Sequence, residues 1–121
     1  MVDHLKKTLG LEYTRVVGNP ETMVQNILFS GHAHFNNELD SVKDLMAEDV
    51  DVLIPGELID WTVANYARDA SQLGKNKAII HLGHFNSEEL GMRYAANWLG
   101  ELIAHEVPVT AVNSADIYHY M

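Results

Sequence analysis

The fold of this chain is decided by residues 78–99, which read AIIHLGHFNSEELGMRYAANWL. The apolar run 78–82 predicts a buried strand, and 89–99 has the composition of a helix. His84 and Glu88 therefore lie where a strand ends and a helix begins. Open α/β sheets bind their ligands at this carboxyl edge. An imidazole and a carboxylate four residues apart can converge there on one cation.

The remaining elements are predicted from hydrophobic pattern and from turn residues. Strands are expected at 13–17, 23–29, 50–54 and 107–112, and helices at 3–9, 38–46, 58–73 and 87–104. The first two strands are expected to pair as an antiparallel hairpin, and the later ones, joined by helices, can run parallel. Residues 1–121 are thus predicted to form a single α/β domain, a mixed sheet with helices packed on it.

Two local signals set expected boundaries within this pattern. Pro55 and Gly56 are expected to stop the third strand, because proline cannot donate to a sheet ladder. Ser87 is a candidate cap for the last helix, because serine hydroxyls accept from free backbone N–H groups.

Composition limits the classes of partner. The 121 residues carry a formal charge of −9 with only eight Lys and Arg, so a nucleic-acid backbone would be repelled. An anionic substrate would require a metal or a local basic spot. No apolar run is long enough to cross a bilayer, and the first residues do not resemble a secretory signal, so we expect a cytoplasmic protein without a membrane partner.

Cysteine is absent, which excludes disulfides and thiolate chemistry. A metal would therefore be held by nitrogen and oxygen. The sequence also lacks a phosphate-binding loop, a G-x-G-x-x-G element, an H-E-x-x-H element and a serine nucleophile elbow. These absences exclude the common nucleotide-binding, zinc-protease and serine-hydrolase classes.

Candidate metal ligands are His84, Glu88, His32 and His34. Glu88 also has a structural explanation, because a carboxylate in the first helical turn gains about 0.3–1 kcal/mol from the helix dipole, and His84 could cap a backbone group. The two histidines of the 30–37 loop are two residues apart and would point the same way in an extended segment. That loop could equally be solvated.

Two further residues lie at predicted strand ends. Glu57 follows Pro55 and Gly56, and it could ligate a metal, act as general base on a metal-bound water, or cap the next helix. His81 lies inside its strand and is expected to be a buried, hydrogen-bonded histidine.

A family resemblance covers most of the chain. Residues 51–57 (DVLIPGE), 83–88 (GHFNSE) and 96–99 (ANWL), together with the opening 9–18 (LGLEYTRVVG), resemble the carboxyl-terminal half of the NGG-interacting-factor-three-like (Nif-three-like) proteins, which in many bacteria are described as GTP cyclohydrolase type 2. The resemblance implies half of a Nif-three-like fold and a site for one or two divalent ions, with zinc, manganese or iron as candidates.

The same resemblance assigns roles residue by residue. It makes His84 and Glu88 metal ligands, and it places the other ligands, an adjacent His pair and an Asp, in the amino-terminal half of the family's fold. Ser87 and Pro55 replace threonines of the family pattern. His32 and His34 stand in a loop that is glycine-rich in relatives, where they could replace the missing ligands.

Three functions therefore stand side by side. The first is a divalent-metal-binding protein, a metal-dependent hydrolase if it is an enzyme, acting on a small molecule with Glu57 as base. The second is a non-catalytic oligomerisation or binding module, for which the ring-like oligomers of relatives imply a homo-oligomer. The third is a ligand-binding domain without metal.

Overall fold

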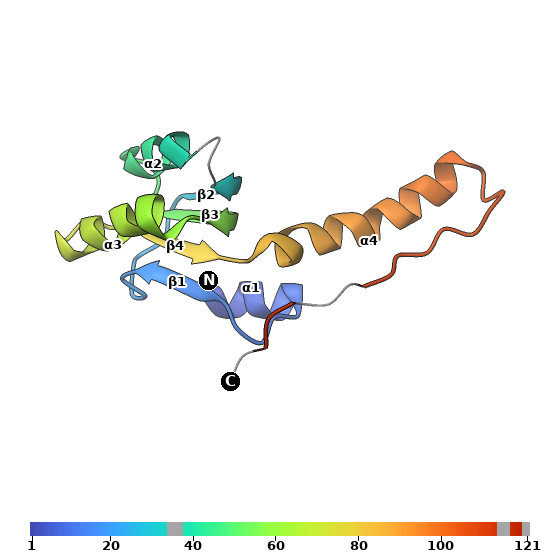
Figure 1. Cartoon of the computed structure of the whole chain (residues 1–121), viewed down its shortest axis with the longest axis horizontal. Helices are drawn as coiled ribbons and strands as arrows, with labels where there is room; N and C mark the ends of the chain where they lie inside the picture. Colours follow the sequence, from blue (N-terminus) through green and yellow to red (C-terminus); the bar gives the residue numbers. More distant parts are fainter. Residues whose placement is uncertain (34–37, 114–116, 120–121) are drawn as a thin grey trace.

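A computed structural model describes residues 1–33, 38–113 and 117–119, with the backbone alone for residues 32, 33 and 38. Its helices and strands alternate through most of the chain. They are α1 (Val2–Leu9), β1 (Arg15–Gly18), β2 (Ile27–Ala33), α2 (Glu38–Met46), β3 (Val52–Leu58), the π-helical η1 (Asp60–Ala64), α3 (Asn65–Gln72), β4 (Ala78–His81) and α4 (His84–Leu102). The predicted mixed sheet with helices packed on it is confirmed (Figure 1).

The sheet separates two apolar layers, because successive side chains of a strand point to opposite faces. Leu53 and Ile79 pack on one face against residues of α2, η1 and α3. Val52, Ile54 and Ile80 pack on the other face, against α1 and the segment that follows it. Figure 1 shows α2 and α3 on one side of the sheet and α1 on the other. Both central strands are therefore buried on both faces.

The strand order is β1-β4-β3-β2, which corrects the predicted hairpin. β2 pairs parallel to β3, β3 pairs parallel to β4, and β1 pairs antiparallel to β4, so the first two strands lie at opposite edges. The segment that connects β1 to β2 is held just before β2 begins. There the Asp51 carboxylate accepts hydrogen bonds from the backbone N–H groups of Gln25 and Asn26. These hydrogen bonds lower the pKa of Asp51.

Several predicted elements differ from the structure, among them β2, which spans Ile27–Ala33 and not residues 23–29. β3 continues through Pro55 to Leu58, because the partner strand β2 shifts register around Gly31, the residue that pairs with Pro55. The helix predicted over 58–73 is divided into η1 and α3. The strand predicted over 107–112 is absent, since residues 103–113 leave the tip of α4 away from the sheet (Figure 1).

The last helix begins at His84, three residues before the predicted cap. Ser87 lies inside the helix, and its hydroxyl donates to the His84 carbonyl oxygen at 2.7 Å. The chain turns from β4 into α4 at Gly83, whose φ of 93° and ψ of 147° belong to a region that only glycine adopts readily. Gly83 therefore fixes where His84 leaves the sheet. Within the described residues no helix is long and apolar enough to cross a membrane.

We expect Gly83→Ala to lower the free energy of unfolding by about 1–3 kcal/mol, because a side chain strains this backbone conformation. Gly91→Ala is the matched control. Gly91 is exposed within α4, and a Cβ there meets no atom within 4 Å, so alanine should stabilise the protein by about 1 kcal/mol. Urea unfolding of the two variants checks this, and equal effects would contradict the assignment of strain to Gly83.

Candidate functional site

The carboxyl edge of the sheet gathers titratable side chains from three strands and a helix. Glu57 lies near the end of β3, His81 ends β4, and His84 begins α4. Arg15 begins the antiparallel strand β1 and pairs in register with His81. On the other side, His32 of β2 pairs in register with Glu57. Segments far apart in the sequence thus meet at one edge.

His84 lies between two carboxylates. Its Nδ1 is 2.8 Å from Oε1 of Glu57, and its Nε2 is 3.3 Å from Oε2 of Glu88. Glu88 is one helical turn beyond His84, so the spacing of α4 brings the two together. Glu57 comes from β3, and its hydrogen bond ties the sheet to the start of α4. All three side chains are roughly half exposed.

The electrostatics of the group favour a protonated imidazole. The hydrogen bond to Glu57 raises the pKa of His84 above its ordinary value of 6.5; desolvation opposes this, and the charge of Glu88 adds to the rise. A cation at His84 is therefore stabilised by both neighbours. A divalent ion bound here would replace that proton.

The structure brings some of the predicted ligands together but not all of them. It brings His84 and Glu88 together with Glu57, which lies in a strand and does not cap η1, whose N-terminus has no side-chain cap. The backbone of His32 is beside that of Glu57, and His34 lies outside the described residues. In the described part of the chain no group of three or more His, Asp or Glu side chains is arranged to hold a metal. The metal roles of these residues stay predictions.

His81 is buried, as expected, but only one of its nitrogens has a partner. Nε2 lies 3.2 Å from the Gly56 carbonyl oxygen and donates to it, whereas the buried Nδ1 has no hydrogen-bond partner among the described residues. Burial lowers the pKa of His81, and the positive charge of Arg15 lowers it further. His81 is therefore neutral near pH 7.

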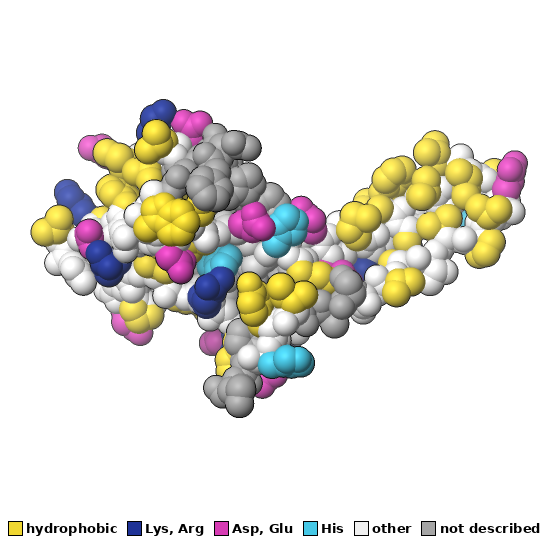
Figure 2. Space-filling view, in the orientation of Figure 1, with side chains coloured by type: hydrophobic (Ala, Val, Ile, Leu, Met, Phe, Trp, Pro, Cys, Tyr) yellow, Lys and Arg dark blue, Asp and Glu magenta, His cyan; other side chains and the backbone are white. Residues whose placement is uncertain are grey.

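Arg15 was missed by reasoning from the sequence. It lines the same depression as His81 and the Glu57–His84–Glu88 group, an open hollow of about 1060 Å³ at the foot of α4. Figure 2 shows basic, acidic and histidine side chains gathered where the helix leaves the body. The available signal was a cation at the start of an otherwise apolar strand.

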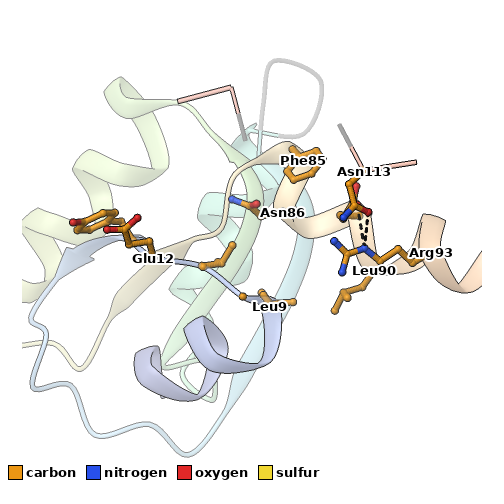
Figure 3. A pocket seen from close by; sticks show the side chains of 11 residues that line it. Leu9, Glu12, Phe85, Asn86, Leu90, Arg93 and Asn113 are labelled. Atoms are coloured by element: carbon orange, nitrogen blue, oxygen red, sulfur yellow. Dashed lines mark hydrogen bonds and ion pairs between the residues drawn. The ribbon is translucent and has the colours of Figure 1, made fainter. Parts of the chain in front are cut away.

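A second cavity, of about 260 Å³, lies between the end of α1 and the first turns of α4 (Figure 3). Its cation, Arg93, is already engaged. The guanidinium Nε lies 3.1 Å from both Glu89 Oε1 and Asn113 Oδ1. The edge depression, with its grouped histidines and carboxylates, is therefore the candidate site.

We expect Glu57→Gln to lower the pKa of His84 toward 6.5, because the charged acceptor on Nδ1 is lost. A pKa of His84 that is raised in the folded state stabilises the protein at pH values below 6.5. This stabilisation is lost as the pH rises through the folded-state pKa. The variant should therefore be destabilised more at about pH 5.5 than at about pH 8.5. NMR titration of the imidazole and unfolding at both pH values measure this.

Glu101→Gln is the control for that experiment. It removes the same charge about 25 Å away along α4. A His84 pKa that moves equally in both variants would show a general charge effect and not the contact with Glu57.

Comparison with known proteins agrees with this architecture. The sequence matches the model of the family Duf34/NIF3 (NGG1p interacting factor 3) over residues 1–116. Among curated proteins, none matches the sequence.

Solved structures share the fold at low sequence identity. Staphylococcus aureus protein SA1388 is 20% identical, with a TM-score of 0.66 over 96% of this chain and 36% of its own. A Bacillus cereus protein related to NIF3 is 21% identical, with a TM-score of 0.67 over 98% of this chain and 31% of its own. The chain spans about a third of the length of these relatives. Because the family match covers nearly all of the sequence, the chain belongs to the DUF34/NIF3 family.

Proposed function

We propose that the chain binds a divalent metal ion at the carboxyl edge of its sheet and that this ion serves hydrolysis of a small molecule. His84 and Glu88 would be ligands from α4, with His32 and His34 as candidates to complete the set. The observation that carries the proposal is the contact of one imidazole with carboxylates from β3 and α4 in an open depression.

The distances in this group fit one ion. Two donors that each lie about 2.1 Å from a tetrahedral ion are roughly 3.4 Å apart. His84 Nε2 and Glu88 Oε2 are separated by 3.3 Å. Imidazole nitrogen with carboxylate oxygen suits zinc, manganese or iron. The charge of −9 also attracts cations to the protein.

Glu57 supports this arrangement from the other side of the ring. Its carboxylate accepts from Nδ1–H of His84, which keeps the tautomer whose Nε2 lone pair faces Glu88. A carboxylate so close to the ligands is also the candidate general base, as predicted from the sequence. A bound ion would supply a water of lowered pKa and polarise the substrate. The Nif-three-like resemblance makes a GTP cyclohydrolase type 2-like reaction the first activity to assay.

We expect the protein to be purified with zinc, manganese or iron, or to bind one of them in titration calorimetry. An ion that binds only the folded state adds about 2.7 kcal/mol to stability when present at 100 times its Kd. His84→Ala should abolish this gain, and Glu57→Gln should weaken affinity about 10–100-fold. The affinity for the metal should also decrease as the pH is lowered, because His84 then takes up a proton.

His4→Ala is the matched control, since His4 is exposed on α1 away from the sheet edge. It should keep the wild-type metal content by elemental analysis. Metal content that survives His84→Ala, or that is lost equally in His4→Ala, would overturn the assignment.

A second function, self-association, is favoured by α4. This helix extends from the body (Figure 1), and of its 19 residues only Gly100 is buried. Its exposed apolar side chains are Leu90, Met92, Tyr94, Trp98, Leu99 and Leu102. Between Tyr94 and Leu102, the end of the helix, only Glu101 is charged. Apolar side chains gathered on an exposed surface normally mark a site of contact with another element or chain, and on the face drawn in Figure 2 hydrophobic side chains run along this arm.

We infer that α4 packs against a second copy of this chain, as the homo-oligomers implied by the resemblance suggest. Leu102→Glu should then reduce the mass measured by light scattering to that of a monomer. The control is Leu73→Glu, a similarly exposed leucine on the body, which should leave the mass unchanged. A wild-type chain that is monomeric at all concentrations would refute self-association and leave α4 to cover another part of a longer protein.

A further inference from the structure

We propose that Arg15 anchors the anionic group of the ligand, so that the depression takes a small molecule with an oxyanion on an apolar body. The oxyanion is a phosphate or a carboxylate. This inference rests on the proposed function in one respect: the reacting part of the molecule would lie at His84 and Glu88.

The topology places Arg15 across the depression from the acidic group. β4 lies between β1 and β3, so two strand spacings, about 10 Å, separate the strand of Arg15 from that of Glu57. His81 occupies the strand between them. A basic end and an acidic, histidine-bearing end thus face one hollow. A molecule held at both ends would lie across the end of β4.

No carboxylate among the described residues pairs with Arg15. It is the single Lys or Arg that lines the hollow, and it makes no ion pair or hydrogen bond through its guanidinium to the residues that the structure describes. In contrast, Arg68 pairs with Asp69 at 2.7 Å, and Arg93 pairs with Glu89 at 3.1 Å. In so acidic a chain, a cation kept apart from carboxylates is available to an external anion.

The neighbour of Arg15 is suited to this task. His81 is buried and neutral, and its Nε2–H is committed to the Gly56 carbonyl. It therefore adds no second positive charge, and its Nδ1 makes no hydrogen bond to the guanidinium. The planar guanidinium can donate two parallel hydrogen bonds to a phosphate or carboxylate.

Much of the remaining lining is apolar, although Thr14, Asn86 and Glu89 also line the hollow. Leu58, Ile59, Leu82, Phe85 and Met92 contribute to the hollow. Small-molecule sites combine such an apolar lining with a few polar groups that fix orientation. We therefore assign an apolar or aromatic body to the ligand, next to its anionic group. Arg15 is the local basic spot that an acidic protein needs to hold an anionic substrate.

The test uses phenyl phosphate, benzoate and phenol as probes of the full chain, with NMR detection of backbone amides and arginine Nε–H groups. Wild-type protein should bind one or both anions and not phenol. Arg15→Gln should weaken that binding at least tenfold, and Arg15→Lys should restore part of it, because the charge returns without the planar fork. Arg68→Gln removes a paired arginine and should change nothing. Binding should weaken with salt.

The phosphate and carboxylate arms identify which oxyanion is preferred. The inference is overturned if neither anion binds, with or without added manganese, or if Arg15→Gln binds them like wild type. Metal affinity, measured separately by calorimetry, should be unchanged in Arg15→Gln. Anion binding at Arg15 in a chain that binds no metal would refute the proposed function and leave this inference standing.

Discussion

The hydrogen bond between His84 Nδ1 and Glu57 Oε1 is the interaction on which the candidate site depends. It connects the end of a buried strand to the first residue of α4, and so fixes the imidazole relative to the sheet. With Nδ1 committed to Glu57, the ring presents Nε2 toward Glu88. The same contact stabilises a proton when no metal is bound. A bound ion would compete with this proton for one position, so the proposed metal affinity would depend on pH.

Two features of the backbone near the site make this contact possible. Gly83 provides the turn that starts α4 directly at His84. The register shift in β2 around Gly31 lets β3 continue past Pro55, so that Glu57 remains in the strand and faces the edge. Both features use conformational freedom of glycine where the chain turns or bulges.

Much of the fold could be predicted from the sequence, because the apolar runs of β3 and β4 and the spacing of α2 are strong local signals. The pairing of β1 with β4 could not, since which edge a short apolar strand takes depends on contacts distant in sequence. The segment 107–112 has strand composition, but no sheet edge lies near it. His84 and Glu88 were found because four-residue spacing at a helix start brings side chains together. Arg15 was missed because only the antiparallel register places it beside His81.

The central claim, one ion shared by His84 and Glu88, is tested most directly by ¹⁵N NMR of the His84 imidazole during zinc titration. We predict that Nε2 shifts on coordination while Nδ1 keeps its proton and its hydrogen bond to Glu57. An unchanged Nε2 signal at saturating zinc, or loss of the Nδ1 proton in place of an Nε2 shift, would contradict the account.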